Sequence, residues 1–329
     1  MTRKRIALVA TLIAAITVLG ACGGAAQPVP RRADASPVVP RPVGAKDPYA
    51  VPSTSAAPPA SCDPRASLRP QGSRPAPGQM PAGSTMGRIV QRGRLIVGVD
   101  QNTYLFGFRD PLTGTLSGFD IDIAHEVARA LFGDPDRIQF KAISSAERIP
   151  AIQNGDVDIV VRTMTMTCER LEQVAFSTEY FTAGQRVLVT RDSSVAGIAD
   201  LGGKKVCATD GSTSIRTVAA APSHPLPVAV TDWTDCLVML QQGQVTAIST
   251  DDTILAGLAA QDLNTKVVGD KITSEPYGVA MAKDATDLVR FVNAVLQQLR
   301  DDGGWQQIYR KWLSGLGATP NPPPARYRD

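Results

Sequence analysis

The chain carries the run Asp158-Ile159-Val160-Val161 shortly before Thr165-Met166-Thr167-Cys168-Glu169-Arg170. The first run predicts a buried strand, and the second predicts a turn with a hydroxyl, free backbone N–H groups and a guanidinium around one small space. Such a set suits a carboxylate, because the fork of an arginine matches two carboxylate oxygens and N–H groups fill the remaining lone pairs. The alternative is an ordinary helix start with a surface arginine.

A second strand end, Ala247-Ile248-Ser249-Thr250-Asp251-Asp252, carries negative charge. A carboxylate holder at one strand end and an ammonium holder at another predict a clamp for a free α-amino acid. Asp251 is the candidate for the ammonium group, whereas Asp252 is better interpreted as a helix N-cap.

Strands and helices alternate along the rest of the chain, which predicts a mainly parallel α/β fold. We expect two α/β lobes joined by crossing strands near residues 181–186 and 274–279. Ligands of open α/β sheets bind at the carboxyl ends of strands, so the cleft between the lobes is the expected site. Lobe 1 is predicted to span residues 87–182 and 278–315, and lobe 2 residues 183–277. Within them, strands are expected at 94–99, 138–143, 157–161, 184–190, 205–208, 228–230, 247–249 and 277–282.

The N-terminus has the features of a targeting signal. A basic run precedes an apolar stretch over residues 6–19, which suits a signal peptide and is short for a membrane span. The small residues before Cys22 predict a lipoprotein signal over residues 1–21, with Cys22 lipidated as the first mature residue. The alternative is a secretory signal in which Cys22 is incidental. The lipoprotein interpretation places the protein on the extracytoplasmic face of the cell membrane.

More than half of the chain's 25 prolines fall in residues 22–86. Such a composition predicts a disordered tether, because it buries too little apolar surface to offset the entropy of ordering. Residues 316–329 are expected to form a disordered tail.

The formal charge of +3 comes from the basic residues of the signal, so the remaining chain is neutral and no nucleic-acid partner is expected. With two histidines and neither a G-x-G-x-x-G run nor a P-loop, the sequence predicts no enzyme and no cofactor.

Four cysteines besides Cys22 predict two disulfides in an exported chain. Three pairings are possible. Cys207 and Cys236 lie within one later segment, which favours pairing them and leaves Cys62 with Cys168. A zinc site is not expected, because the spacing is wrong and no histidine is nearby.

Several short motifs occur together in one order and spacing. They are Gly118-Phe119-Asp120-Ile121-Asp122, Pro150-Ala151-Ile152-Gln153, Thr165-x-Thr167-x-x-Arg170, Phe176-Ser177, Tyr180-Phe181, Asp251-Asp252, Tyr277-Gly278-Val279 and Trp305 to Trp312. In this order and spacing the chain resembles the polar amino-acid-binding proteins of ABC importers, of the glutamine/glutamate/aspartate-binding lipoprotein type found in actinobacteria, over residues 88–315. The resemblance implies a two-lobed periplasmic-binding-protein fold of type II.

The resemblance also implies roles for individual residues. Arg170 and the Thr165 hydroxyl would hold the α-carboxylate, together with the helix start at Ser212-Thr213. The Thr163 carbonyl and Asp251 would hold the ammonium group.

Three further positions bear on the ligand's side chain. Asp100 matches a position that reads a side-chain amide, Phe106 matches an aromatic cleft wall, and Arg162 could meet an acidic side chain. Cys168 departs from the usual Pro or Asp, and Ser145 stands near the place of an aromatic cleft residue. The ligand is therefore left open among Gln, Glu, Asp and Asn.

The function implied is a monomeric, lipid-anchored solute-binding protein that delivers a polar amino acid to the permease of an ABC importer. A membrane sensor protein is the alternative partner. An enzyme of this fold would need a cleft acid or base without a ligand partner, for which Glu147 is the weak candidate. The pair Glu147-Arg148 is better interpreted as a solvated helix start.

Overall fold

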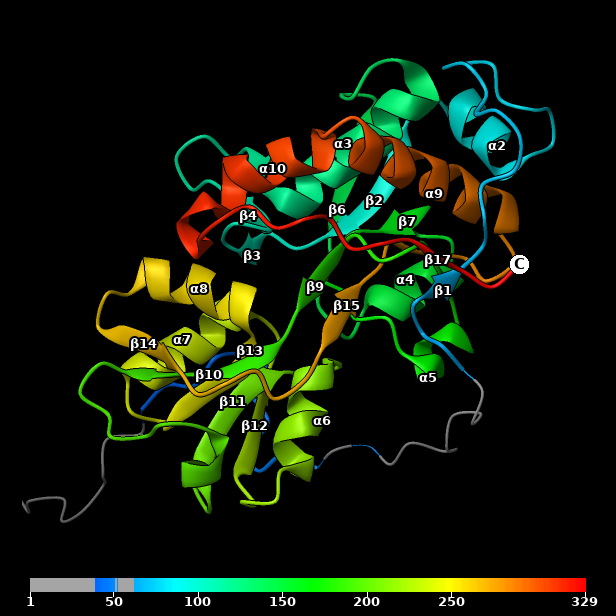
Figure 1. Cartoon of the computed structure of the whole chain (residues 1–329). Coiled ribbons are helices and arrows are strands. Elements are labelled where there is room, and N and C mark those ends of the chain that lie inside the picture. The colour runs from blue at the N-terminus through cyan, green and yellow to red at the C-terminus, as the bar shows by residue number, and fades with distance from the viewer. Residues whose placement is uncertain (1–38, 51, 53–61) are drawn as a thin grey trace, which may run out of the picture. The chain divides into compact units, whose positions relative to one another are not determined.

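The structure is a computed structural model, and it describes residues 39–50, 52 and 62–329. The predicted signal peptide over residues 1–21 and Cys22 lie outside the described residues. Residues 41–329 form one compact unit. Within this unit, two α/β lobes are joined by a pair of crossing strands (Figure 1).

Lobe 1 is built on a five-stranded sheet with the order β6-β2-β7-β16-β8. β2, β6 and β7 are parallel because helices connect them, whereas β16 runs antiparallel to β7 because the chain enters it from lobe 2. The interior strand β2 buries Leu95, Val97 and Val99 completely. The strands are β2 (Leu95–Val99), β6 (Ile138–Ala142), β7 (Ile159–Val160), β8 (Ala175–Phe176) and β16 (Ala280–Met281), and a smaller sheet holds β3 (Asn102–Thr103), β4 (Gly107–Arg109) and β5 (Leu116–Ser117).

Apolar side chains at helical spacing attach the helices of lobe 1 to its sheet. On α3, Phe119, Ile123 and Val127 recur every four residues, and all three are fully buried. α3, α9 and α10 pack against one another over this lobe (Figure 1). The helices are α2 (Thr85–Arg92), α3 (Phe119–Phe132), α4 (Arg148–Gln153), α5 (Cys168–Leu171), α9 (Thr286–Asp301) and α10 (Gly304–Leu313), followed by the 3-10 turn η2 (Ser314–Leu316).

Lobe 2 repeats the design with the strand order β12-β11-β13-β10-β14. β11, β12 and β13 are parallel, and β10 and β14 complete the sheet in antiparallel register. Leu188, Val206 and Ile248 are among its fully buried core residues. Its elements are β10 (Gln185–Thr190), η1 (Ile198–Leu201), β11 (Lys205–Thr209), α6 (Thr213–Ala220), β12 (Leu226–Val230), α7 (Trp233–Gln241), β13 (Ala247–Asp251), α8 (Asp252–Gln261) and β14 (Thr265–Val268).

The two connections between the lobes form a ribbon of their own. β9 (Phe181–Ala183) and β15 (Glu275–Tyr277) pair antiparallel, with Glu275 opposite Ala183 and Tyr277 opposite Phe181. The predicted crossing strands are therefore confirmed. The strand expected over 277–282 is instead two strands, β15 and β16, because β15 pairs with β9 and β16 with β7 and β8.

The described parts of the predicted tether are ordered against the lobes, which corrects the expectation for those residues. Tyr49 lies in the core of lobe 2, and Lys46 forms an antiparallel β-bridge with Ala229 of β12. Asp47 forms ion pairs with Arg41 and Lys205. A few anchoring side chains are enough to fix a segment whose average composition indicates disorder.

Residues 62–86 pack on lobe 1 instead. β1 (Ala66–Ser67) pairs in parallel with β17 (Arg326–Tyr327), so the predicted tail over 316–329 is also ordered at this point. Ser67 is buried and donates a hydrogen bond to the Phe176 carbonyl (2.7 Å). The segments around β1 and β17 stabilise one another through this pairing. The composition of either segment alone does not reveal it.

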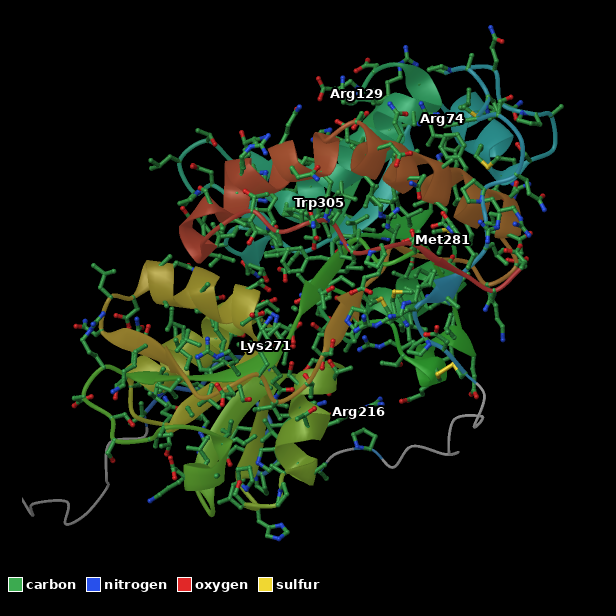
Figure 2. All side chains as sticks on the ribbon, viewed as in Figure 1. Arg74, Arg129, Arg216, Lys271, Met281 and Trp305 are labelled. Atoms are coloured by element: carbon green, nitrogen blue, oxygen red, sulfur yellow. A yellow bond between two sulfur atoms is a disulfide. The ribbon has the colours of Figure 1, made fainter. Side chains whose placement is uncertain are left out.

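Both favoured disulfides are present, Cys62–Cys168 and Cys207–Cys236, and sulfur–sulfur bonds of this kind are drawn in yellow in Figure 2. Cys207–Cys236 lies within lobe 2, and Cys62–Cys168 ties the segment before β1 to the start of α5 in lobe 1. Of the helices in the described part of the chain, none combines the length and apolar character that a membrane crossing requires.

Candidate functional site

Strand ends from both lobes converge on one small cavity. β7 leads into Thr163, β11 into Gly211, and β13 ends at Asp251, which is the edge of an α/β sheet where ligands bind. Most of the residues predicted to bind a ligand line this cavity: Thr163, Thr165, Arg170, Ser212, Thr213 and Asp251. The structure adds Ser145, Arg148, Ser214, Trp233, Thr250 and Ile254 to its lining.

Arg170 is positioned by the short helix α5. Thr167 caps this helix by accepting a hydrogen bond from the Arg170 N–H (3.2 Å). The Arg170 guanidinium is buried and donates to the carbonyl oxygens of Thr165 (2.7 Å) and Gly211 (3.1 Å). Burial, and then the nearby Arg216, lowers the pKa of Arg170 to about 10, so the group stays charged at neutral pH.

A second buried guanidinium, that of Arg148, lies beside the first. The sequence favoured a solvated helix start at Glu147-Arg148, and for Arg148 this interpretation is wrong, since its side chain is 3 % exposed. It donates to the carbonyl oxygens of Ser145 (2.9 Å) and Gly211 (3.3 Å). Burial, followed by repulsion from Arg170, lowers the pKa of Arg148 well below its usual value.

Neither guanidinium forms an ion pair with a carboxylate anywhere in the described ranges. Carbonyl oxygens satisfy their N–H groups but do not neutralise their charge. The signal that could have identified Arg148 is its place just after the end of β6, where the other site residues also follow strands.

Asp251 brings a carboxyl group to the cavity. It is buried, and one of its oxygens accepts a hydrogen bond from the Tyr277 hydroxyl, while its other oxygen, Oδ1, is buried without a hydrogen-bond partner. Burial, followed by repulsion from Glu275, raises the pKa of Asp251 to about 8. A buried carboxylate oxygen without a donor is the arrangement expected of a group that receives an ammonium ion.

The turn at Thr163 is held by the carboxylate of Asp120, a role that the sequence did not predict. Asp120, at the start of α3, accepts hydrogen bonds from the Thr163 N–H (2.8 Å) and the Tyr180 hydroxyl (2.7 Å). Thr163 has a φ of 39°, a left-handed conformation that costs energy for a residue other than glycine. Asp120 therefore stabilises the strained turn that directs Thr163 at the cavity.

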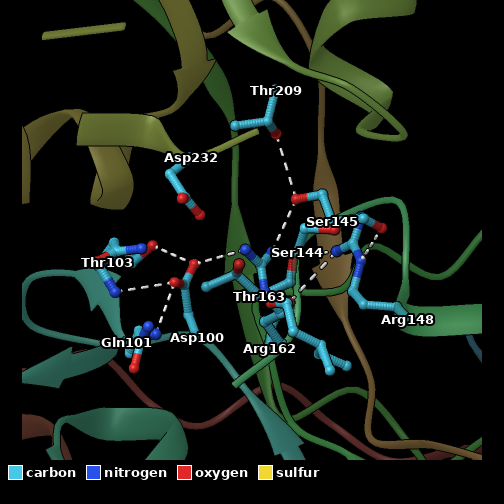
Figure 3. Close-up of polar contacts among 12 residues, drawn as sticks. Asp100, Gln101, Thr103, Ser144, Ser145, Arg148, Arg162, Thr163, Thr209 and Asp232 are labelled. Carbon is cyan, nitrogen blue, oxygen red and sulfur yellow. Dashed lines mark hydrogen bonds and ion pairs between the residues drawn. The ribbon is translucent and has the colours of Figure 1, made fainter. Parts of the chain in front are cut away.

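Three of the residues predicted to bind a ligand do not line the cavity. Asp100 and Arg162 are both buried and form an ion pair with each other (2.9 Å; Figure 3), so each satisfies the other's charge. Asp100 also accepts a hydrogen bond from the Thr103 hydroxyl (2.7 Å). Phe106 packs between Phe119, Phe181 and Tyr277 in the lobe 1 core rather than on a cleft wall.

The lobes meet directly around the cavity. The Gly211 carbonyl of lobe 2 accepts from both arginines of lobe 1, and Thr209 donates to Ser145 across the same boundary (3.2 Å; Figure 3). The remaining cavity measures about 10 Å³, which is room for about one water molecule. A ligand can therefore enter only when the lobes separate.

Two α/β lobes joined by a two-stranded ribbon, with a charged clamp between them, define a binding protein of the two-lobed periplasmic type. Residues 95–315 match the model of the bacterial extracellular solute-binding proteins, family 3. The chain belongs to this family.

Several relatives are similar over most of their length. The ABC transporter glutamine-binding protein GlnH of Bacillus subtilis is 39% identical over 230 residues, covering 70% of this chain and 84% of that protein. The glutamate-binding protein GluB of Corynebacterium efficiens is 31% identical over 232 residues, covering 67% and 78%. Among solved structures, an ancestral arginine-binding protein bound to glutamine has a TM-score of 0.63 at 35% identity, covering 68% of this chain and 98% of that one.

Proposed function

We propose that this protein captures a free polar amino acid, and that among Glu, Asp, Gln and Asn it prefers the two acids. The observation that carries the proposal is the charge arrangement of the cavity: the unpartnered Oδ1 of Asp251 with the guanidinium groups of Arg148 and Arg170. An acidic amino acid has one ammonium group and two carboxylates, which matches this set group for group.

In the proposed mechanism, the ligand binds between separated lobes and is enclosed when they close. Arg170 with the Thr165 hydroxyl receives the α-carboxylate, and Asp251 with the Thr163 carbonyl receives the ammonium group. Arg148 receives the side-chain carboxylate or amide. The ligand favours closure because contacts to both lobes form only in the closed arrangement.

The relatives support delivery of the amino acid to the permease of an ABC importer, since GlnH of Bacillus subtilis is named as part of an ABC transporter. We further propose that Cys22 carries a lipid anchor that holds the protein at the extracytoplasmic face of the membrane. A membrane sensor as the partner remains the second candidate, because presentation to a sensor needs the same clamp.

The test is a thermal-shift panel of the purified protein against the twenty amino acids, after unfolding and refolding to remove any bound ligand. A ligand that binds only the native state raises the melting temperature with the logarithm of its saturation. We expect clear shifts with Glu and Asp and smaller ones with Gln and Asn. A protein that no amino acid stabilises would overturn the proposal.

The Arg148→Gln variant should lose selectivity for acids. Without the guanidinium, a side-chain carboxylate would be buried without a counter-charge, whereas an amide would still be hydrogen-bonded. We expect the affinity for Glu to fall by roughly tenfold more than the affinity for Gln, measured by isothermal titration calorimetry.

Arg300→Gln is the matched control for this substitution. Arg300 is another largely buried arginine that donates to carbonyl oxygens, those of Pro323 (2.9 Å) and Glu179 (2.7 Å), away from the cavity. Its substitution should leave the Glu-to-Gln affinity ratio unchanged. An unchanged ratio in Arg148→Gln as well would remove Arg148 from the side-chain subsite.

Binding should weaken as the pH falls below about 8. The raised pKa of Asp251 means that this carboxyl holds a proton below about pH 8 before the ligand binds. The ligand's ammonium group requires the charged form, so a proton must leave, and the dissociation constant should rise by up to about tenfold per pH unit.

Calorimetry between about pH 6 and about pH 8 tests this expectation, because the ligand's own groups titrate outside that window. The Asp251→Asn variant should bind weakly at every pH and give a flat profile. A flat profile in the wild-type protein would show that Asp251 does not meet the ammonium group.

A further inference from the structure

Glu275 is a buried carboxylate on the crossing ribbon that none of the roles above uses. It lies on β15, the strand that runs from lobe 2 back to lobe 1, and its side chain is 4 % exposed. Thr273 and Tyr277, two residues to either side, point to the same face of the strand. That face is directed at the clamp, since the Tyr277 hydroxyl donates to Asp251.

The Glu275 carboxylate bridges hydroxyl groups of the two lobes. Its Oε2 accepts hydrogen bonds from the Thr165 hydroxyl of lobe 1 (2.6 Å) and the Thr213 hydroxyl of lobe 2 (2.9 Å). Its Oε1 accepts from the Thr273 hydroxyl (2.6 Å). Thr165 and Thr213 are the hydroxyl-bearing residues assigned above to the ligand's α-carboxylate, so a carboxylate of the protein itself already occupies that position.

The charge of Glu275 also acts on the clamp. It opposes ionisation of Asp251, and it favours the charged form of Arg170. A second carboxylate brought to the same hydroxyls would stand next to a like charge in a water-poor cleft, where such a pair is costly. The cavity beside these groups has room for about one water molecule, so no amino acid fits next to the Glu275 bridge in this closed arrangement.

We propose that Glu275 is an internal stand-in for the ligand's carboxylate. Its side chain holds the lobes together through Thr165 and Thr213, and it must leave both hydroxyls before an amino acid can bind. This inference rests on the proposed function, since it assigns Glu275 as a competitor for the same subsite. Under such competition, the apparent dissociation constant equals the intrinsic one divided by the fraction of molecules in which the subsite is free.

The competition also bears on which ligand is bound. When Glu275 withdraws, Arg148 and Arg170 face only Asp251, and an acidic amino acid restores the balance of charge. The residual repulsion between Glu275 and the ligand is greater for Glu and Asp than for Gln and Asn. Removing the charge at position 275 should therefore improve binding of the acids more than binding of the amides.

Two substitutions separate the parts of this role. Glu275→Gln keeps an acceptor oxygen but loses the charge, and hydrogen bonds to a charged acceptor are the stronger ones. Glu275→Ala removes both. By calorimetry of the whole protein with Glu, Asp, Gln and Asn, we expect the dissociation constant for Glu to fall by roughly tenfold in Glu275→Ala and by less in Glu275→Gln.

Glu179→Gln is the matched control. Glu179 is an equally buried carboxylate that accepts from the Thr182 hydroxyl (2.5 Å) and pairs with Arg65 (3.3 Å), outside the cavity lining. Its substitution should leave the affinities unchanged. Dissociation constants that stay the same or rise in both Glu275 variants, while the wild type binds, would overturn the stand-in role.

A second measurement does not depend on the identity of the ligand. Small-angle X-ray scattering without added amino acid should give a larger radius of gyration for Glu275→Ala than for the wild type, because the bridge between Thr165 and Thr213 is gone. An unchanged radius would overturn the bridge. If no amino acid binds the wild type or either variant, the proposed function is wrong. The scattering measurement then still decides whether Glu275 holds the lobes together.

Discussion

Replacing Arg170 with alanine should reduce the binding free energy of the amino acid by about 2–5 kcal/mol. Arg170 is buried, charged and without an acidic partner among the described residues, so it is the group best placed to receive the α-carboxylate. Its loss would leave that carboxylate enclosed in a cleft of low dielectric without a counter-charge. Isothermal titration with Glu measures the effect.

Arg216→Ala is the appropriate control for this substitution. Arg216 lies on α6 (Figure 2) and forms an ion pair with Glu169 across the lobe boundary, with the two side chains 43% and 37% exposed. An exposed pair of this kind contributes about 1 kcal/mol or less. Binding by Arg170→Ala within about threefold of the wild type would exclude Arg170 from the carboxylate subsite.

The Gly211→Ala variant should be unable to close fully. Gly211 has a φ of 72°, and a Cβ atom placed there would lie 2.7 Å from the Cα of Ala146 on the opposite lobe. The lobes would have to separate, which would lengthen the hydrogen bonds from Arg148 and Arg170 to the Gly211 carbonyl. We expect a loss of about 1–3 kcal/mol in binding free energy, measured by calorimetry.

Gly203→Ala separates the effect on closure from the effect on the backbone. Gly203 is another glycine of lobe 2 with a similar φ of 66°, and a Cβ there would meet nothing within 4 Å. Both variants should lose a similar stability of about 1 kcal/mol from the left-handed conformation, yet Gly203→Ala should bind normally. Equal affinities for the two variants would show that the Gly211 contact is unimportant for ligand enclosure.

The alternation of strands and helices was predictable because the fold depends on local patterns. Apolar runs such as Leu95–Val99 and four-residue spacing such as that of Phe119 and Ile123 are visible within a few residues of sequence. The small sheet formed by β3, β4 and β5 was missed, since its strands have only two or three residues each. The packing of Tyr49 and Ser67 was missed because it depends on partners far away in the chain.

Two residues of the clamp were predictable because they have a local sequence signal, whereas residues whose partners lie far away in the chain were not. Arg170 and Asp251 follow strand ends in recognisable runs, and the structure places both at the cavity. Arg148 follows the end of β6, but its contact with a carbonyl of the other lobe leaves no trace in the sequence. Glu275 carries no local signal, since its partners are hydroxyls of Thr165, Thr213 and Thr273. Asp100 and Arg162 each fitted a ligand role alone, but their mutual ion pair could not be inferred from sequence.

The pairing of β9 with β15 has a mechanical consequence. Two independent linkers would let the lobes twist and slide as well as open, but strands hydrogen-bonded to each other must bend together. We therefore expect the lobes to open mainly by bending of this ribbon, and energy transfer between a dye on each lobe would follow that motion. A membrane partner that contacts both lobes could then distinguish the ligand-bound protein from the ligand-free protein by the distance between the lobes alone.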